Sequence, residues 1–210
     1  IYTGEDTLSL HDALPILRGL WSAGLRRPLL PVVLFECGNL ATTMLILRAT
    51  DQLTAAGVPG ATSVAILLYA AHNAVAALVA LAGGSWLDRS GPRRVFAAGA
   101  AAYLAAYLFL ATDARTPALL LIGFVLAGTG IGFAETAESA LVARALPDRL
   151  RGSGFGVVGG IQAVGNIIGT AVAGVLYTTV SPTVAFGYAA AWMALAVAAS
   201  AFFTHPAPDA

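Results

Sequence analysis

Three carboxylic acids stand inside long apolar stretches of this sequence: Glu36, Glu135 and Glu138. A charge at the centre of a membrane span costs about 2.5–3.5 kcal/mol on insertion scales, so an ionisable residue there is a functional candidate by default. Glu135 and Glu138 are three residues apart and therefore share one helix face. Glu135 is the expected proton carrier and Glu36 the alternative, although each is equally explained as a structural or solvated residue.

Amide and imidazole side chains in the same stretches are further candidates for a substrate or ion pathway. The residues are Asn39, His72, Asn73, Gln162 and Asn166. Asn39 lies about one helical turn from Glu36. His72 suits proton coupling, although a hydrogen-bonded packing role is the favoured interpretation. Gln162 and Asn166 are one turn apart, and they either face a substrate or hold helices together.

Two other charged groups lie near the ends of apolar stretches, where ion pairs are the simpler interpretation. Arg48 and Asp51 are three residues apart, which predicts an interfacial ion pair. Glu138 is expected to be structural and to pair with one of three arginines, Arg89, Arg93 or Arg144.

The composition is that of a membrane protein, with 58% hydrophobic and only 10% charged residues. Soluble domains carry about 25% charged residues. The sequence contains no metal-ligand spacing, no Ser/His/Asp arrangement and no phosphate-binding glycine loop, so we expect no metal, no cofactor and no enzymatic activity. It also lacks the basic patch that a nucleic-acid partner requires. The single cysteine, Cys37, is expected to be a buried, inert thiol.

Six apolar stretches approach the ~20 residues that a helix needs to cross a bilayer. They do not alternate as the strands of a β-barrel would. The sequence therefore predicts an all-α membrane protein with spans at 31–49, 62–81, 95–111, 118–141, 155–180 and 183–203.

The arginines predict the orientation of these spans, because cytoplasmic loops carry an excess of basic residues. Only Arg48 and Arg115 fall on one side of the membrane. The others fall on the opposite side, which places both chain ends in the cytoplasm: Arg18, Arg26, Arg27, Arg89, Arg93, Arg94, Arg144, Arg149 and Arg151.

Between the second and third spans the chain reads GSWLDRSGPRR, from Gly84 to Arg94. A tight turn between antiparallel helices needs small residues where backbones approach, which Gly84 and Gly91 supply. Asp88 is suited to pair with an arginine or to face a helix N-terminus. The basic residues of the loop suit an anionic lipid leaflet, and they are Arg89, Arg93 and Arg94.

This spacing resembles the signature loop of the major facilitator superfamily, G-x3-D-R-x-G-x-R-R. Two further stretches resemble the family in the expected order, LILRATD at 45–51 and ESALVARALPDRLRGSGFG at 138–156. The resemblance covers about residues 26–204 and implies the C-terminal half of a twelve-helix transporter. It further implies two inverted three-helix repeats, a substrate site near the midplane, and a cavity lined by the first and fourth spans.

Residues 1–16 differ in character from the rest: they are polar and do not begin with Met. The run TLSLHDALPI is one reading frame of the end of a common sequencing adapter, and Ile1, Tyr2 and Thr3 match the adapter further upstream. We therefore expect 1–16 to be translated adapter, not native protein. A cytoplasmic linker over 17–30, the six-helix body over 31–204 and a cytoplasmic tail over 205–210 would follow.

The sequence thus predicts a secondary active transporter in a bacterial inner membrane, with proton coupling and export of a small solute as further expectations. Its partners would be membrane lipid, an unidentified small molecule and a missing N-terminal half. The alternative is a membrane protein that transports nothing, such as an integral enzyme or an assembly subunit.

Overall fold

The computed structural model describes residues 26–146 and 148–200, and within these ranges every regular element is a helix. The expected adapter segment, most of the linker and the expected tail lie outside the described residues. The helices are α2 (Arg26–Gly38), α3 (Thr42–Ala55), α4 (Ala61–Ser90), α5 (Pro92–Leu110), α6 (Pro117–Ala145), α7 (Asp148–Thr179) and α8 (Pro182–Ala199).

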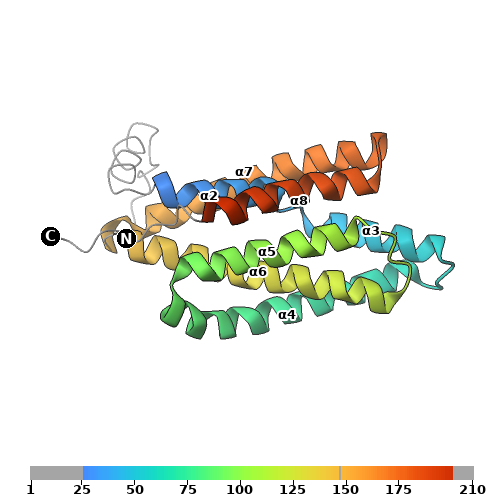
Figure 1. Ribbon diagram of the computed structural model, residues 1–210, viewed down its shortest axis with the longest axis horizontal. Coiled ribbons are helices and arrows are strands. Elements are labelled where there is room, and N and C mark those ends of the chain that lie inside the picture. Colours follow the sequence, from blue (N-terminus) through green and yellow to red (C-terminus); the bar gives the residue numbers. More distant parts are fainter. Residues whose placement is uncertain (1–25, 147, 201–210) are drawn as a thin grey trace, which may run out of the picture.

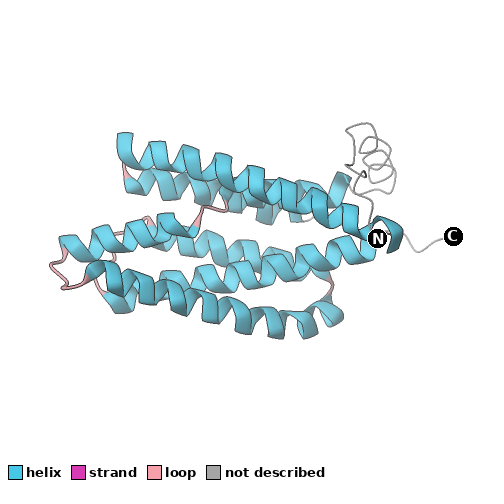
Figure 2. Ribbon diagram, turned by 180° about the vertical axis from the view of Figure 1, so that it is seen from behind, coloured by secondary structure: helices cyan, strands magenta, loops and turns pink. Residues whose placement is uncertain are grey.

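The described helices include six segments that are long and apolar enough to cross a membrane, with α2 and α3 together forming the first. The all-α class predicted from hydropathy is confirmed. Most helices extend past the apolar stretches that identified them, because helical hydrogen bonding continues into the polar ends. Seen from behind, the elements are helices joined by short loops (Figure 2).

The bundle consists of two three-helix repeats of opposite direction (Figure 1). The first repeat contains α2 with α3, then α4 and α5, and the second contains α6, α7 and α8. The leading helix of each repeat packs in the other repeat: α2 contacts α7 and α8, whereas α6 contacts α4 and α5. Contact between α5 and α8 completes the bundle. This exchange agrees with the inverted repeats implied by the family resemblance.

Glycine pairs spaced four residues apart on α6 and α7 bring these two helices of the second repeat into close contact with helices of the first. A Cβ atom at Gly128 of α6 would lie 2.4 Å from the carbonyl oxygen of His72 in α4. A Cβ at Gly169 of α7 would lie 2.4 Å from the carbonyl oxygen of Cys37 in α2, and Gly165 is similarly close to Glu36. Such small-residue ridges let transmembrane helices approach backbone to backbone.

Aromatic rings fill the junction between α2, α5 and α8. Phe35 packs against Phe96 and Tyr103, and Tyr107 packs against Tyr103 and Phe186. All five rings are almost completely buried. This cluster fixes α2 against α5, and thereby positions the polar residues that follow Phe35 in the sequence.

The turn between α4 and α5 is a single residue, Gly91, with φ = 79° and ψ = 162°. Its positive φ favours glycine, and Pro92 then starts α5 at a position that needs no N–H donor. The expectation that Gly84 allows a close backbone approach is wrong for the described residues. A Cβ there would meet nothing within 4 Å, because it is the neighbouring Gly83 that faces α6, beside Phe133.

Candidate functional site

The first span is broken in its middle, which corrects the prediction of one continuous helix over 31–49. Helix α2 ends at Gly38 and α3 begins at Thr42, so residues 39–41 lie between two half-helices. Non-helical backbone at membrane depth is tolerated only where protein buries it or where it lines a cavity. The dipeptide Gly38-Asn39 inside an apolar run was the signal for this break in the sequence.

Side chains from two other helices satisfy the backbone of the break. The N–H of Leu40 donates to the Tyr107 hydroxyl of α5 at 3.1 Å, and the N–H of Ala41 donates to Oγ1 of Thr170 at 2.8 Å. Nδ2 of Asn166 donates to the carbonyl oxygen of Asn39 at 2.7 Å. The break is therefore a defined structural feature with partners on α5 and α7.

Glu36 lies in the last turn of α2, immediately before the break. Its side chain is 2% exposed, and its Oε2 atom accepts a hydrogen bond from Nδ2 of Asn39 at 3.0 Å. Gly165 of α7 packs directly on it. Hydrogen bonds thus join Glu36, Asn39 and Asn166 in one polar group at the contact between α2 and α7.

A second polar group lies between α6 and α7 and surrounds a pocket of about 200 Å³. We call it the Glu138 pocket. Its lining residues are Glu135, Glu138, Ser139, Phe155, Val158, Gly159 and Gln162. Glu138 is 2% exposed, whereas Glu135 is exposed on the rim. Glu36 is close enough to both acids for their charges to interact, so the pocket and the break belong to one acidic region.

The partner of Glu138 differs from the sequence prediction. Its Oε2 atom accepts a hydrogen bond from Nε2 of Gln162 at 2.8 Å, and Oε1 is buried with no hydrogen-bond partner among the described residues. Arg144 instead pairs with Asp88, with Nη2 and Oδ1 3.5 Å apart. The expected pairing of Glu138 with an arginine is therefore wrong, because Glu138 points into the contact between α6 and α7, away from the charged loop.

The two polar residues of α4 are separate from this acidic region in their hydrogen bonding. His72 is buried, and its Nδ1 atom lies 3.3 Å from the carbonyl oxygen of Phe124 in α6. Asn73 is exposed and donates to the carbonyl oxygen of Tyr69 one turn earlier. His72 therefore joins α4 to α6, and Asn73 bonds within its own helix.

The loop residues of the GSWLDRSGPRR stretch gather at one end of the bundle. Asp88 is exposed in the last turn of α4, where it contacts Arg144, and the other three basic residues are also exposed: Arg89, Arg93 and Arg94. We call this the Asp88 end. It includes the turn after residue 90 and the C-terminal end of α6, on the left in Figure 1.

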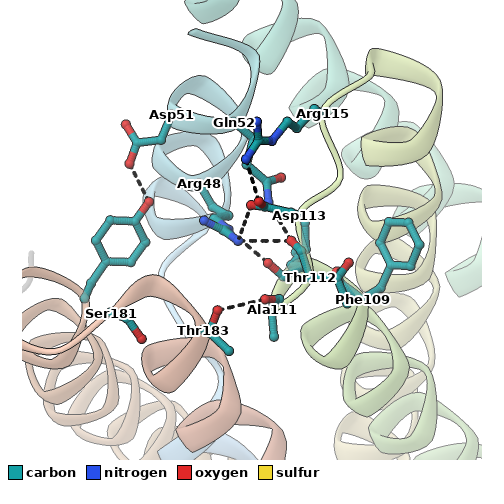
Figure 3. Close-up of polar contacts among 12 residues, drawn as sticks. Arg48, Asp51, Gln52, Phe109, Ala111, Thr112, Asp113, Arg115, Ser181 and Thr183 are labelled. Carbon is teal, nitrogen blue, oxygen red and sulfur yellow. Dashed lines mark hydrogen bonds and ion pairs between the residues drawn. The ribbon is translucent and has the colours of Figure 1, made fainter. Parts of the chain in front are cut away.

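The opposite end contains a polar cluster around Arg48 (Figure 3), which we call the Arg48 cluster. Arg48 is 7% exposed and donates from Nε to the carbonyl oxygen of Leu110, and from Nη2 to that of Thr112, both at 3.0 Å. Asp113 is 3.8 Å from Nη2. The guanidinium thus binds carbonyl groups left free at the end of α5.

Asp51 is not the ionic partner of Arg48, which corrects the second expected ion pair. It accepts a hydrogen bond from the hydroxyl of Tyr177 in α7, so it joins α3 to α7. Gln52 donates to the Thr112 carbonyl oxygen at 2.6 Å. Local spacing does not predict these contacts, because each joins segments sixty residues or more apart.

No group of three or more metal-binding side chains exists among the described residues. The described chain thus contains a broken membrane span, an acidic region with a pocket beside it, and two charged ends.

The comparisons with known proteins identify the family. The family model of the Major Facilitator Superfamily matches residues 28–210. No curated protein matches the chain. The chain therefore belongs to the Major Facilitator Superfamily, whose members are membrane transporters and not enzymes, and it is a multi-pass membrane protein.

Proposed function

We propose that this superfamily member is the C-terminal half of a secondary active transporter that moves a small solute across a bacterial inner membrane. The observation that carries the proposal is the break between α2 and α3, beside the buried Glu36. Transporters of inverted-repeat design use discontinuous helices of this kind near the midplane to form their sites.

The chemistry of the break supports a transport role. Glu36 is a buried acid next to irregular backbone, and its amide partner Asn39 belongs to the break itself. A movement of α2 relative to α3 would therefore change the surroundings of an ionisable group. Such a coupling between helix movement and charge is what ion-driven transport requires.

Two helices support the proposal of a missing partner half. Helices α4 and α7 are the least buried of the long apolar segments, each with 17% of its most apolar window buried. Gly156 and Gly160 of α7 face open space in this chain. We propose that an N-terminal six-helix half covers part of α4 and α7, and that lipid covers the remainder. By the arginine distribution, the Asp88 end and both termini are cytoplasmic.

We further propose that Glu135 carries the coupling proton. It lies on the rim of the Glu138 pocket and is exposed in this chain, so in the full transporter it would face the space between the N-terminal and C-terminal halves. The test uses the full-length protein, with its upstream coding sequence recovered from genomic DNA, in sealed vesicles. Glu135→Gln keeps the volume of the side chain and removes its proton exchange.

Transport driven by a proton gradient should stop in this variant, while exchange of labelled for unlabelled solute, which moves no proton, should continue. Asp148→Asn, an exposed acid at the Asp88 end, is the matched control and should leave both activities unchanged. Normal gradient-driven transport by Glu135→Gln would exclude Glu135 as the carrier and favour Glu36. Absence of any solute movement by the unsubstituted protein would contradict the transport function itself.

A further inference from the structure

We propose that three side-chain hydrogen bonds join α7 to the broken first span as one cooperative unit, and that the outermost bond controls how firmly the break is held. We call these bonds the α7 zipper. They are made by Asn166, Thr170 and Tyr177. The zipper is a conformational device that goes beyond the proposed transport function.

The three residues of the zipper share one face of α7. At 3.6 residues per turn, positions 166, 170 and 177 lie within about 40° of one another around the helix axis. With a rise of 1.5 Å per residue, the first and last of them are about 16 Å apart along the helix. The same face of α7 therefore follows the first span from the break to its outer end.

The bonds of the zipper differ in what they hold. The two inner bonds bind backbone groups of the break: Nδ2 of Asn166 donates to the Asn39 carbonyl oxygen, and the N–H of Ala41 donates to Thr170. The outer bond instead joins two side chains at the surface, where the Tyr177 hydroxyl donates to exposed Asp51 (Figure 3). Because water competes for exposed donors and acceptors, the outer bond is the one that opens first.

The remaining contacts of the two partners decide which side moves when the outer bond opens. Helix α3 stays attached to the end of α5, because Arg48 and Gln52 bind carbonyl groups there. Helix α7 is held more lightly. It contacts α6 far less than α4 and α5 do, and 17% of its most apolar window is buried. The outer part of α7 therefore moves away from α3.

This movement reaches the buried acid beside the break. Gly165 and Gly169 of α7 pack directly on the backbone of Glu36 and Cys37, so a shift of α7 loosens both contacts. The N–H of Ala41, once released by α7, can return to the Cys37 carbonyl oxygen, its normal helical partner four residues earlier. The surface bond is thus coupled to the surroundings of Glu36.

The only cysteine of the sequence, Cys37, is a half-buried reporter at this contact. The test measures its rate of reaction with N-ethylmaleimide, with the chain in lipid nanodiscs. Tyr177→Phe keeps the ring and removes the hydroxyl. The reaction should become about three- to tenfold faster, the factor expected for the loss of one hydrogen bond. An unchanged rate would overturn the proposal.

Tyr188→Phe on α8 is the matched control and should leave the rate unchanged. Its ring packs against Trp192, and no described residue bonds to its hydroxyl. Asp51→Ala should have the same effect as Tyr177→Phe, and the double variant should react no faster than either, because all three lose the same bond. An effect of Tyr177→Phe without an effect of Asp51→Ala would refute the outer bond as the control point.

A second reporter separates zipper opening from general loosening of the fold. Cys37→Ser with Val95→Cys moves the thiol to a fully buried position of α5 near the Asp88 end. Its reaction rate should not respond to Tyr177→Phe, and an equal acceleration at both reporters would overturn the proposal. No solute moves in these measurements. A negative result would therefore refute the zipper and leave the transport function standing, whereas a full-length protein that moves no solute would refute transport alone.

Discussion

Arg48 and Glu138 both have ionisable side chains that are almost fully buried, and they lie toward opposite ends of the same bundle. The protein surrounds them very differently. Arg48 donates to two backbone carbonyl groups and lies 3.8 Å from Asp113. Among the described residues, Glu138 has one donor, Gln162, and its other oxygen has no partner. The hydrogen bonds of the buried Arg48 guanidinium are therefore nearly complete, whereas those of the buried Glu138 carboxyl group are not.

The difference concerns how completely the protein satisfies the hydrogen bonds of each buried group. A buried charge whose hydrogen bonds are complete holds elements together, and its removal leaves other buried groups unpaired. A buried polar atom without a hydrogen-bond partner costs stability, so native proteins keep few of them. Gln52 of the Arg48 cluster also has an oxygen with no partner among the described residues, which adds a cost of the same kind at that end.

The largest effect that this comparison predicts is for Arg48→Met. Methionine fills a similar length without donors, which leaves the buried Leu110 carbonyl unpaired, at about 1–3 kcal/mol. We expect the melting temperature of the chain in detergent to fall by about 5 °C. Arg115→Met, which replaces an exposed arginine near the Arg48 cluster, is the matched control and should change the melting temperature little. Equal effects of the two substitutions would remove the structural role from Arg48.

A smaller effect is expected for Glu138→Gln. The amide oxygen still accepts from Gln162, and the amide nitrogen replaces an oxygen that already had no partner among the described residues, so the free energy of unfolding should change by no more than about 1 kcal/mol. Thermal unfolding of the ligand-free chain at pH 7 measures this. A fall as large as that of Arg48→Met would show that Glu138 is fully satisfied in the folded protein, and the contrast between the two ends would collapse.

Hydropathy predicted the fold class because apolarity is a local property of each span. The family resemblance supplied the repeat architecture, since the Asp88 loop has a recognisable spacing. The break in the first span depended instead on Tyr107 and Thr170, whose hydrogen bonds to residues 40 and 41 span 67 and 129 positions of sequence. Such long-range partners leave no trace in local periodicity.

The charged residues show the same limit. Spacing suggested that Arg48 pairs with Asp51, and Glu138 was expected to pair with Arg89, Arg93 or Arg144. In both cases the side chains found other partners once the helices packed: Arg48 binds the end of α5, and Asp51 binds Tyr177 of α7. Sequence spacing identified which residues are polar within the membrane, and packing decided which of them meet.

The smallest effect is expected for Asp113→Asn at the rim of the Arg48 cluster. The hydrogen bond and charge of Arg115, with Oδ2 and Nη2 2.7 Å apart, lower the pKa of this exposed carboxyl. Because the pKa in the folded state is below that in the unfolded state, its contribution to stability is present above about pH 4 and lost as the pH falls through the folded pKa.

The asparagine variant should therefore melt slightly below the unsubstituted chain at pH 7 and pH 5, by a small fraction of the Arg48→Met effect. The difference should shrink below about pH 4, and also in high salt, which screens an exposed pair. Thermal unfolding of both proteins at several pH values measures it. A difference that vanishes already between pH 7 and pH 5 would mean that a group other than Asp113 titrates there. A difference as large as that of Arg48→Met would make the exposed rim, and not the buried guanidinium, the part of the cluster that holds this end together.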